Sequence, residues 1–213
     1  MDSNKIYVLD NIIPQDYQNY LYNLFANNIS FFANGFIPST TYSNKEVFNE
    51  YLKDDYNLKD KVYETNQLVH RFFDKGKIFD EKYHEIIPIL HYVQSHFNFS
   101  FLYEPLRIKA NLKLKIGSEY KEKINTPHVD IPINSYNNFT ILYYINDSDG
   151  DTIIFNESYN DNSPESNFTI RKKITPKQGR IVIFPTRLYH SGSHCVDSNV
   201  RCVLNINIAI LYQ

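Results

Sequence analysis

The C-terminal half of the chain is a succession of short segments in which apolar and polar residues alternate. The segment 106–117, LRIKANLKLKIG, carries apolar side chains at even positions and Arg, Lys or Asn at odd positions up to Lys115. Further segments follow, separated by turn sequences such as DSDG and PKQG: NNFTILYYIND, DTIIF, FTIRKKI, RIVIFP and NVRCVLNINIAILY. Alternation with a period of two predicts half-buried β-strands. About seven such strands without intervening helices predict a sandwich or jelly roll from residue 105 onward.

The first 104 residues are dominated by helical spacing instead. A helix is predicted after Pro14, where Tyr17 and Leu21 fall on one face. Two more helices are predicted in KDKVYETNQLVHRFFDKG, which stops at Gly76, and in EKYHEIIPILHYVQSHF, where a proline marks a kink or an internal start. A short strand over residues 5–9 precedes them. The helices are expected to cover part of the apolar faces of the strands.

No repeat and no linker separates the two halves of the chain. With 213 residues the chain has ample material for one hydrophobic core. We therefore predict a single domain over residues 1–213, mainly β with N-terminal helices. In it, residues 1–104 give mainly helical support, and residues 105–213 form the jelly-roll core that carries the functional site.

Composition and charge narrow the range of partners and compartments. A formal net charge of −2 gives no general attraction to nucleic acid or to an anionic membrane. No apolar run approaches the ~18 residues of a membrane-spanning helix, and the first residues, MDSNKIYVLDN, lack the basic region of a signal peptide. Cys195 and Cys202 are too few for a disulfide framework. A cytoplasmic location, without membrane or nucleic-acid partners, is therefore expected.

The motif NTPHVDIPINS, residues 125–135, places His128 and Asp130 two positions apart. In an extended segment the side chains i and i+2 project from one face, so an imidazole and a carboxylate would converge. His-x-Asp alone is a common surface tripeptide, and a metal site needs a third ligand. His190, between two predicted strands, is a natural candidate. Two imidazoles and one carboxylate form the facial triad of non-haem Fe(II) oxygenases.

His194 is an alternative third ligand, because the sequence HSGSH places it four residues after His190. A spacing of four would suit two ligands on a helix. The intervening Ser and Gly residues favour a loop, so we favour His190.

The last predicted strand places a basic residue on a face that should point between the sheets. Its even positions, from Cys202 to Ile210, are apolar, whereas Arg201, Asn205 and Asn207 share the opposite, mixed face. A buried arginine without an anion would cost several kcal/mol. Arg201 therefore predicts a bound carboxylate or phosphate, which a guanidinium can bind in a bidentate manner.

The motifs HVD, TILYYIND, PKQGRIVIFP, YHSG and RCVLNI together resemble those of the Fe(II)/2-oxoglutarate-dependent dioxygenases, particularly the prolyl-4-hydroxylase-like branch. The resemblance covers roughly residues 106–211. It implies a double-stranded β-helix (jelly roll) core buttressed by helices. It also implies His128, Asp130 and His190 as the catalytic iron ligands, and Arg201 as the anchor of the distal carboxylate of 2-oxoglutarate.

The same resemblance extends to other residues of the co-substrate pocket. Tyr144 in LYYIN lies where family members often place a second hydrogen-bond donor to that carboxylate, and its strand parity agrees with an inward direction. Asn205 shares the face of Arg201, and Asn111 on the first long strand is a weaker candidate. The alternatives are a core aromatic residue for Tyr144 and ordinary polar strand residues for the two asparagines.

The implied activity is hydroxylation of a substrate C–H bond, with O2 and 2-oxoglutarate consumed and succinate and CO2 released. Ascorbate is an implied candidate reductant. Peptidyl proline leads the implied substrates, and a free amino acid, another small metabolite and a nucleobase are the alternatives. The oligomeric state is not predicted. Two features depart from the family pattern: DGDT stands where many prolyl hydroxylases have Gly-Gly, and the spacing from His190 to Arg201 is slightly long.

Two other function classes fit parts of the sequence. A cupin-like metal enzyme that does not use 2-oxoglutarate would share the barrel and the metal, although Arg201 favours the oxygenase. A non-catalytic jelly-roll binding protein would need no metal at all. Lys109, Lys113 and Lys115 are expected to form a solvated or cleft-lining stripe, because runs of charge are usually exposed.

Overall fold

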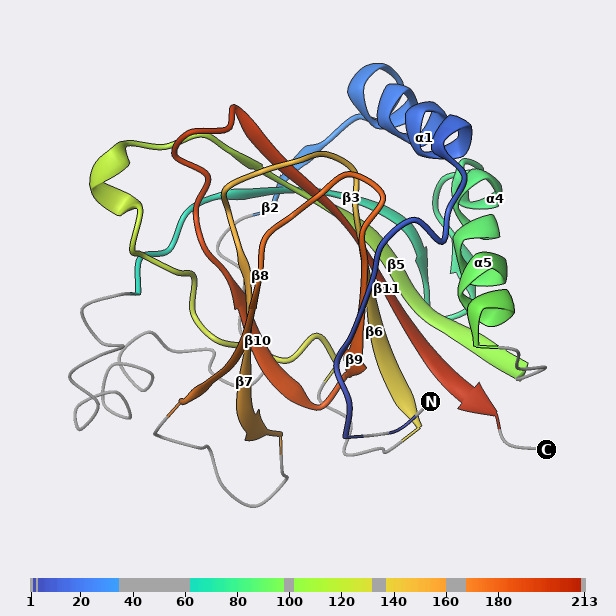
Figure 1. Cartoon of the computed structure of the whole chain (residues 1–213). Helices are drawn as coiled ribbons and strands as arrows, with labels where there is room; N and C mark the ends of the chain where they lie inside the picture. Colours follow the sequence, from blue (N-terminus) through green and yellow to red (C-terminus); the bar gives the residue numbers. More distant parts are fainter. Residues whose placement is uncertain are drawn as a thin grey trace.

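Two β-sheets form the centre of the molecule in the computed structural model (Figure 1), which describes residues 2, 4–34, 62–97, 102–131, 137–159 and 168–211. In spatial order the larger sheet contains β1 (Tyr7–Leu9), β9 (Ile181–Pro185), β6 (Asn138–Tyr144), β11 (Val200–Leu211), β5 (Leu102–Leu114), β3 (Gln67–Asp74) and β2 (Phe32–Asn34), with β4 (Lys77–Ile78) paired to β3. The smaller sheet contains β10 (Leu188–Gly192), β7 (Thr152–Ser158) and β8 (Ile170–Ile174). The predicted jelly-roll class is confirmed.

The helices cover the outer face of the larger sheet. Figure 1 shows α1 (Gln15–Asn27), α4 (Tyr83–Ile86) and α5 (Pro88–His96) on the side of this sheet that faces away from the smaller one. Proline is tolerated in the first turn of a helix because its missing N–H would have no partner there, and α5 begins at Pro88. The predicted internal helix start is therefore confirmed. A short 3-10 helix, η1 (Ser118–Tyr120), follows β5.

The alternation of β6 and β11 divides the buried residues between two cores. The core between helices and sheet includes Leu21, Phe25, Ile89, Val93, Ile141, Tyr143, Leu204 and Ile206. The core between the two sheets includes Leu142, Tyr144, Ile154, Leu188 and Val203. Because neighbours along a strand project to opposite faces, the odd positions of β11 point between the sheets. The predicted inward face of this strand is thus confirmed.

Residues 67–74 form strand β3, so the helix predicted across this part of KDKVYETNQLVHRFFDKG is wrong. The first three residues of that segment, 59–61, lie outside the described residues. β3 pairs with β5 and turns back into β4 through Lys75 and Gly76, whose φ angles are 48° and 78°. Positive φ at both central residues is typical of a type I′ hairpin turn, so Gly76 serves a hairpin and not a helix end.

The reason for this error is that the apolar residues of the segment fit both periods. Phe72 and His70 are buried on one face of β3, in the period-two pattern of a strand. A hydrogen-bonding partner that is distant in the sequence, β5, decides between strand and helix, and local spacing does not report it. The N-terminal half therefore supplies strands to the larger sheet as well as helices to its outer face.

Phe72 provides a test of the packing of β3. Its side chain is fully buried and contacts Phe25 of α1 edge-on, with ring centroids 5.8 Å apart. Replacing Phe72 by Ala should lower the free energy of unfolding by about 3–5 kcal/mol, because it removes buried apolar area and leaves a cavity. Phe32→Ala is the control: this ring is 68% exposed, and its loss should cost at most about 0.5 kcal/mol. Chemical denaturation measures both, and similar losses would contradict the described packing.

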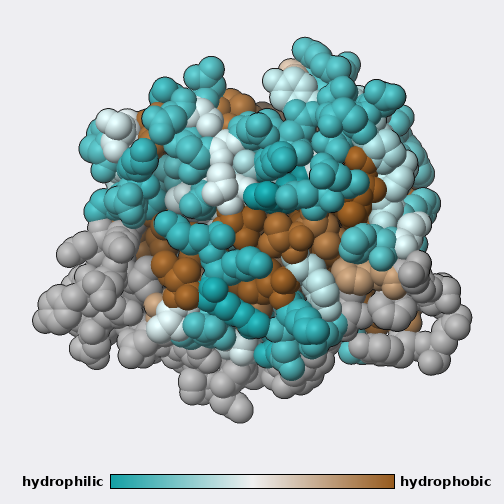
Figure 2. Space-filling view, in the orientation of Figure 1, coloured by the Kyte–Doolittle hydropathy of each residue, from teal (hydrophilic) through white to brown (hydrophobic). Residues whose placement is uncertain are grey.

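One face of the molecule carries a group of apolar side chains at its surface. Figure 2 shows hydrophobic residues gathered near the centre of this face, surrounded by hydrophilic ones.

Both cysteines, Cys195 and Cys202, are buried and free. Among the helices described, none has the length and apolar character needed to cross a membrane.

Candidate metal centre

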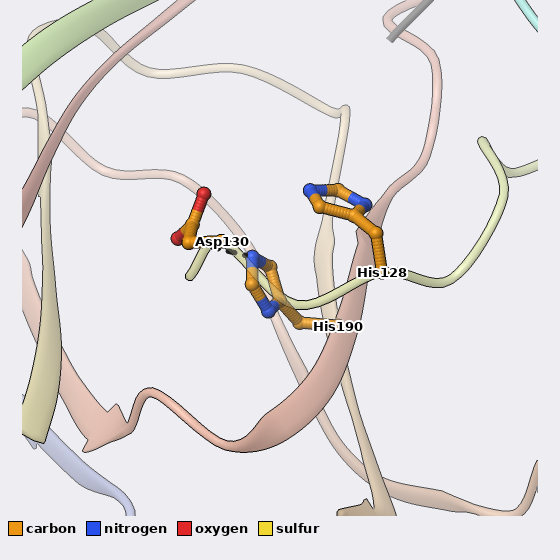
Figure 3. Close-up of side chains that lie close together, drawn as sticks. All are labelled: His128, Asp130 and His190. Carbon is orange, nitrogen blue, oxygen red and sulfur yellow. Dashed lines mark ion pairs between the residues drawn. The ribbon is translucent and has the colours of Figure 1, made fainter. Parts of the chain in front are cut away.

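Backbone pairing holds His128 and His190 side by side. The amide of each residue donates to the carbonyl of the other, with both N···O distances at 2.9 Å, in an isolated antiparallel bridge. The ring centroids lie 4.6 Å apart. Figure 3 shows both rings and the Asp130 carboxylate around a common space. The sequence pattern did not predict β10, the strand that carries His190, because LYHSG is short and ends in turn-forming residues.

Each of these two imidazoles has one nitrogen beside a backbone carbonyl. Nδ1 of His128 lies 3.1 Å from the Thr126 oxygen, and Nδ1 of His190 lies 3.2 Å from the Leu188 oxygen. A carbonyl only accepts, so the hydrogen of a neutral ring belongs on Nδ1, and Nε2 presents a lone pair. This is the arrangement that orients histidine ligands of metals.

The ionisation of His128 agrees with this arrangement. Burial, followed by the nearby His190, lowers the pKa of His128 to about 3. The ring is therefore neutral at physiological pH, as a metal ligand has to be.

Nitrogen groups of four side chains surround the Asp130 carboxylate. Its Oδ1 accepts a hydrogen bond from Nη2 of Arg107 at 2.9 Å and lies 3.8 Å from Nζ of Lys109. Its Oδ2 accepts from Nδ2 of Asn205 at 2.8 Å and from Nδ2 of Asn207 at 3.3 Å. The four partners come from β5 and β11, whose inward faces meet at this carboxylate. The backbone thus places a fully enclosed carboxylate beside the two histidines.

The Asp130 carboxylate is anionic in this setting. Burial alone would raise the pKa of its carboxyl, but His190, Arg107 and Lys109 together hold that pKa well below its usual range. Nε2 of His190 lies 3.5 Å from Oδ2 of Asp130. A hydrogen on this Nε2, or a metal ion in its place, would face the carboxylate oxygen and stabilise its negative charge.

Three ligand atoms, one from each of His128, Asp130 and His190, lie within 4.8 Å of one another. No other group of three or more His, Cys, Asp or Glu ligands comes together in this way within the described part of the chain. His194, the alternative third ligand, is engaged elsewhere: Nε2 lies 2.9 Å from the Tyr63 oxygen and Nδ1 lies 3.3 Å from Thr65 Oγ1. The structure therefore groups His190, and not His194, with the HVD motif.

Arg201 lines the same cavity as the two histidines and lies on β11, four residues before Asn205. Its side chain is buried, and it donates from Nε to the Gly150 oxygen at 2.6 Å and from Nη2 to Thr152 Oγ1 at 2.7 Å. Its Cζ atom lies 5.9 Å from the centre of the Tyr144 ring. The structure thus brings Arg201 and Tyr144 together between the sheets.

Thr152 links these two residues and was missed in the sequence. Its Oγ1 accepts from Nη2 of Arg201 and, at 2.6 Å, from the hydroxyl of Tyr144. Both lone pairs of Oγ1 are then used, and its own hydrogen is left for another acceptor. Thr152 lines the cavity, so that acceptor can be a ligand. The only signal in the sequence was its position in DGDT, at the start of a predicted strand.

Two asparagines also face the cavity, in different places. Asn205 lies beside Asp130, and Asn111 lies opposite Val203 in the register of β5 and β11. The Oδ1 atoms of both are buried and have no hydrogen-bond partner among the described residues. A buried oxygen of this kind costs free energy unless a ligand or water pairs with it. Both residues line the cavity, so they point to an occupant.

The predicted stripe of Lys109, Lys113 and Lys115, on β5 and just after it, is not uniformly solvated. Lys115 is exposed, Lys109 lies next to Asp130, and Lys113 is only 4% exposed. Lys109 and Lys113 both line the cavity, so the cleft-lining alternative holds for these two residues.

Comparison with known proteins agrees with the fold. Residues 117–209 match the sequence model of the 2OG-Fe(II) oxygenase superfamily. This range contains both histidines, Asp130 and Arg201. No curated protein matches the chain in sequence.

Several solved structures share the fold at low sequence identity. A 2OG-Fe(II) oxygenase family oxidoreductase from Burkholderia pseudomallei aligns with a TM-score of 0.60 and 13% identity, over 96% of this chain and 84% of its own. HygX from Streptomyces hygroscopicus, solved with nickel and 2-oxoglutarate, aligns at 0.59 and 8%, over 97% and 83%. A Trichoplax adhaerens prolyl hydroxylase, in complex with a hypoxia inducible factor peptide fragment, aligns at 0.55 and 14%, over 98% and 84%.

Proposed function

We propose that the chain is a 2OG-Fe(II) oxygenase, on the basis of the match of residues 117–209 to the model of that superfamily, and that it hydroxylates a C–H bond of its substrate. The observation that carries this proposal is the content of one cavity. His128 and His190, whose ligand atoms are grouped with that of Asp130, line it together with the buried Arg201, which lies four residues along β11 from the Asn205 that contacts Asp130. A metal barrel without a dicarboxylic co-substrate would need the three ligands but not the buried cation.

The donor set fits iron(II), the metal of this superfamily. His128 and His190 would supply neutral Nε2 atoms, and Asp130 would supply an anionic oxygen, which together make the 2-His-1-carboxylate triad. Arg107 and Lys109 would keep Asp130 deprotonated, and the Asn205 amide would orient it. We propose that these contacts hold the carboxylate ready for the metal.

The part of the cavity around Arg201 fits the distal carboxylate of 2-oxoglutarate. The Arg201 guanidinium is a planar donor that can bind a carboxylate in a bidentate manner. Thr152 retains a hydroxyl hydrogen for the same carboxylate, and Tyr144 fixes the Thr152 side chain through its own hydroxyl. Tyr144 would therefore act mainly by positioning Thr152. Asn111 and Asn205 would offer their unpaired oxygens to water or to the occupants of the cavity.

When bound, the metal and co-substrate supply the oxidising chemistry of this superfamily, in which O2 and 2-oxoglutarate are consumed, succinate and CO2 are released, and a C–H bond is hydroxylated. The chain's residues have the complementary tasks: they hold ligands, fix their protonation, and keep the cavity enclosed. Among the described residues the cavity contains no separate acid–base pair, and this chemistry needs none. Ascorbate is the reductant we would add to maintain the metal as iron(II).

Peptidyl proline is the first substrate class to test, and small metabolites are the second. The motif resemblance favours the prolyl-4-hydroxylase-like branch, and a peptide-bound prolyl hydroxylase shares the fold. The experiment is 2-oxoglutarate turnover by the Fe(II)-loaded protein across a panel of proline-containing peptides and metabolites. A substrate should raise succinate formation above the uncoupled background and gain one oxygen atom by mass spectrometry. If the loaded protein forms no succinate with or without any of them, the proposed function fails.

Tyr144 and Tyr143 form a matched pair for testing the distal pocket. Tyr144→Phe should weaken 2-oxoglutarate binding by about 3- to 10-fold, because it removes one hydrogen bond that positions Thr152. Tyr143 is equally buried but belongs to the helix-side core, so Tyr143→Phe should leave the affinity unchanged. Calorimetric titration of 2-oxoglutarate into the oxygen-free, Fe(II)-loaded proteins measures both. Equal affinities in all three proteins would remove Tyr144 from the pocket.

A further inference from the structure

Two cations oppose each other across neighbouring strands inside the barrel. Lys113 of β5 is the register partner of Arg201 of β11, so their side chains project from the same face of the sheet. Both residues are buried, with 4% and 6% of their surface exposed. Like charges directly opposite each other destabilise a sheet, and burial increases that cost. A pair of this kind needs an anion nearby.

The described residues do not supply that anion. No carboxylate among them lies within 4.0 Å of either the Lys113 ammonium or the Arg201 guanidinium. Nζ of Lys113 donates only to backbone carbonyls, those of Gly192 at 3.0 Å and Ser193 at 3.4 Å. The charge of Glu64 raises the pKa of Lys113, but Oε1 of Glu64 accepts a hydrogen bond from the Thr126 amide at 2.5 Å.

The two cations share one small space, which a glycine keeps open. A Cβ atom on Gly192 would lie 3.2 Å from Nζ of Lys113 and 3.7 Å from Nη1 of Arg201. Both cationic groups therefore border the same point. Gly192, Lys113 and Arg201 all line the cavity that also contains His128 and His190. A carboxylate at this end of the cavity can contact both cations.

We propose that Lys113 is a second anchor of the 2-oxoglutarate distal carboxylate, acting with Arg201 as a two-cation clamp. The inference rests on the proposed function, which places the co-substrate in this cavity. Arg201 supplies a planar fork, whereas Lys113 supplies a compact ammonium from the neighbouring strand. One carboxylate would thus offset the repulsion between two buried cations. The clamp makes the distal carboxylate, and not only the metal-binding end, a main determinant of which 2-oxo acid the pocket accepts.

The protonation state of Lys113 allows a second test of the clamp, through proton uptake when 2-oxoglutarate binds. Burial, followed by the Arg201 charge, lowers the pKa of Lys113 to about 7, while Glu64 and Cys195 oppose the shift. His194 also lies close enough to Lys113 to be affected by its charge. Near pH 7 part of the protein therefore has a neutral Lys113, and a bound carboxylate favours its charged form. Binding of 2-oxoglutarate should then take up protons, and Arg201 alone, which stays charged, cannot cause this.

The test is calorimetric titration of 2-oxoglutarate and of oxalate into oxygen-free, Fe(II)-loaded protein. Oxalate can bind a metal through two oxygens but has no distal carboxylate. Lys113→Met should weaken 2-oxoglutarate binding by about 10- to 100-fold and leave oxalate binding within about twofold. Titrations at pH 7 in buffers of different ionisation enthalpy should show proton uptake in the wild type and none in Lys113→Met.

Two further variants make the result specific. Lys115→Met removes an exposed lysine that lies just after the end of β5, and it should change none of these quantities. Lys113→Gln keeps a donor for the Gly192 carbonyl but removes the charge, so its 2-oxoglutarate affinity should equal that of Lys113→Met. It also replaces Lys113→Met in the test if that variant does not fold. Unchanged 2-oxoglutarate affinity in either Lys113 variant, or an equal loss for oxalate, overturns the clamp. Absence of 2-oxoglutarate binding by the wild type would instead overturn the proposed function.

Discussion

Replacement of Asp130 by Ala is expected to abolish stoichiometric Fe(II) binding. The change removes the only anionic ligand of the proposed triad, and Asp130→Glu should also weaken binding, because an extra methylene displaces the ligating oxygen from the position that Asn205 and Asn207 fix. The Ala variant should also lose about 1–3 kcal/mol of stability, because the partly buried Arg107 and Lys109 lose the charge that they contact. Iron content after anaerobic loading and gel filtration measures the first effect, and denaturant unfolding measures the second.

The expected stability loss calls for a second ligand variant and a matched control. His128→Ala removes a neutral ligand without leaving a charge unpaired, so it should lose iron while remaining folded. His194→Gln changes the buried histidine that is engaged by Tyr63 and Thr65, and it should retain iron. Full iron content in folded Asp130→Ala or His128→Ala protein would mean that the metal binds elsewhere.

Arg201→Ala should raise the dissociation constant of 2-oxoglutarate by tens- to thousands-fold and leave iron binding nearly unchanged. A charge-assisted, bidentate pair in a buried site is worth about 2–5 kcal/mol when one partner is truncated, and each ~1.4 kcal/mol is tenfold in affinity. Arg201→Lys should restore part of the affinity, because it keeps the charge but loses the planar fork. The measurement is the same calorimetric titration in oxygen-free, Fe(II)-loaded protein.

Arg180→Ala is a suitable control for the charge change. Arg180 pairs with Asp10, with Nε 2.8 Å from Oδ1, and is not among the residues that line the cavity. Its replacement should leave 2-oxoglutarate affinity unaltered. Equal affinities of wild type and folded Arg201→Ala would place the co-substrate on another cation, with Lys113 the first to examine, or would show that the dicarboxylic acid is not the co-substrate.

The sequence predicted those parts of the site that follow from strand alternation. The period of two in β11 and β6 correctly assigned Arg201, Asn205 and Tyr144 to the inward face. The spacing of His128 and Asp130 likewise placed both on one side of an extended segment. Alternation specifies the face of a strand because one residue of slippage would move every apolar side chain into the wrong layer.

The features that the sequence did not predict depend on pairing between distant segments. β3 was mistaken for a helix because its partner β5 lies beyond a hairpin and two helices. The burial of Lys113 follows from its register with Arg201, which no local pattern reports. Arg107 and Asn207 contact Asp130 only because β5, β11 and the HVD segment come together in the fold. Thr152 is recognisable as a residue of the site only from the hydrogen bonds that it accepts from Tyr144 and Arg201.

The measurement that tests the central claim most directly is succinate formation together with O2 uptake by the Fe(II)-loaded protein, for wild type and His190→Ala. The proposed site predicts that O2 uptake by the wild type depends on 2-oxoglutarate, yields succinate in equal molar amount, and is abolished in the folded variant. O2 uptake without succinate would indicate a cupin-like metal enzyme. Equal succinate formation by both proteins, or no iron binding by either, would contradict the assignment of His128, Asp130 and His190 as the iron site.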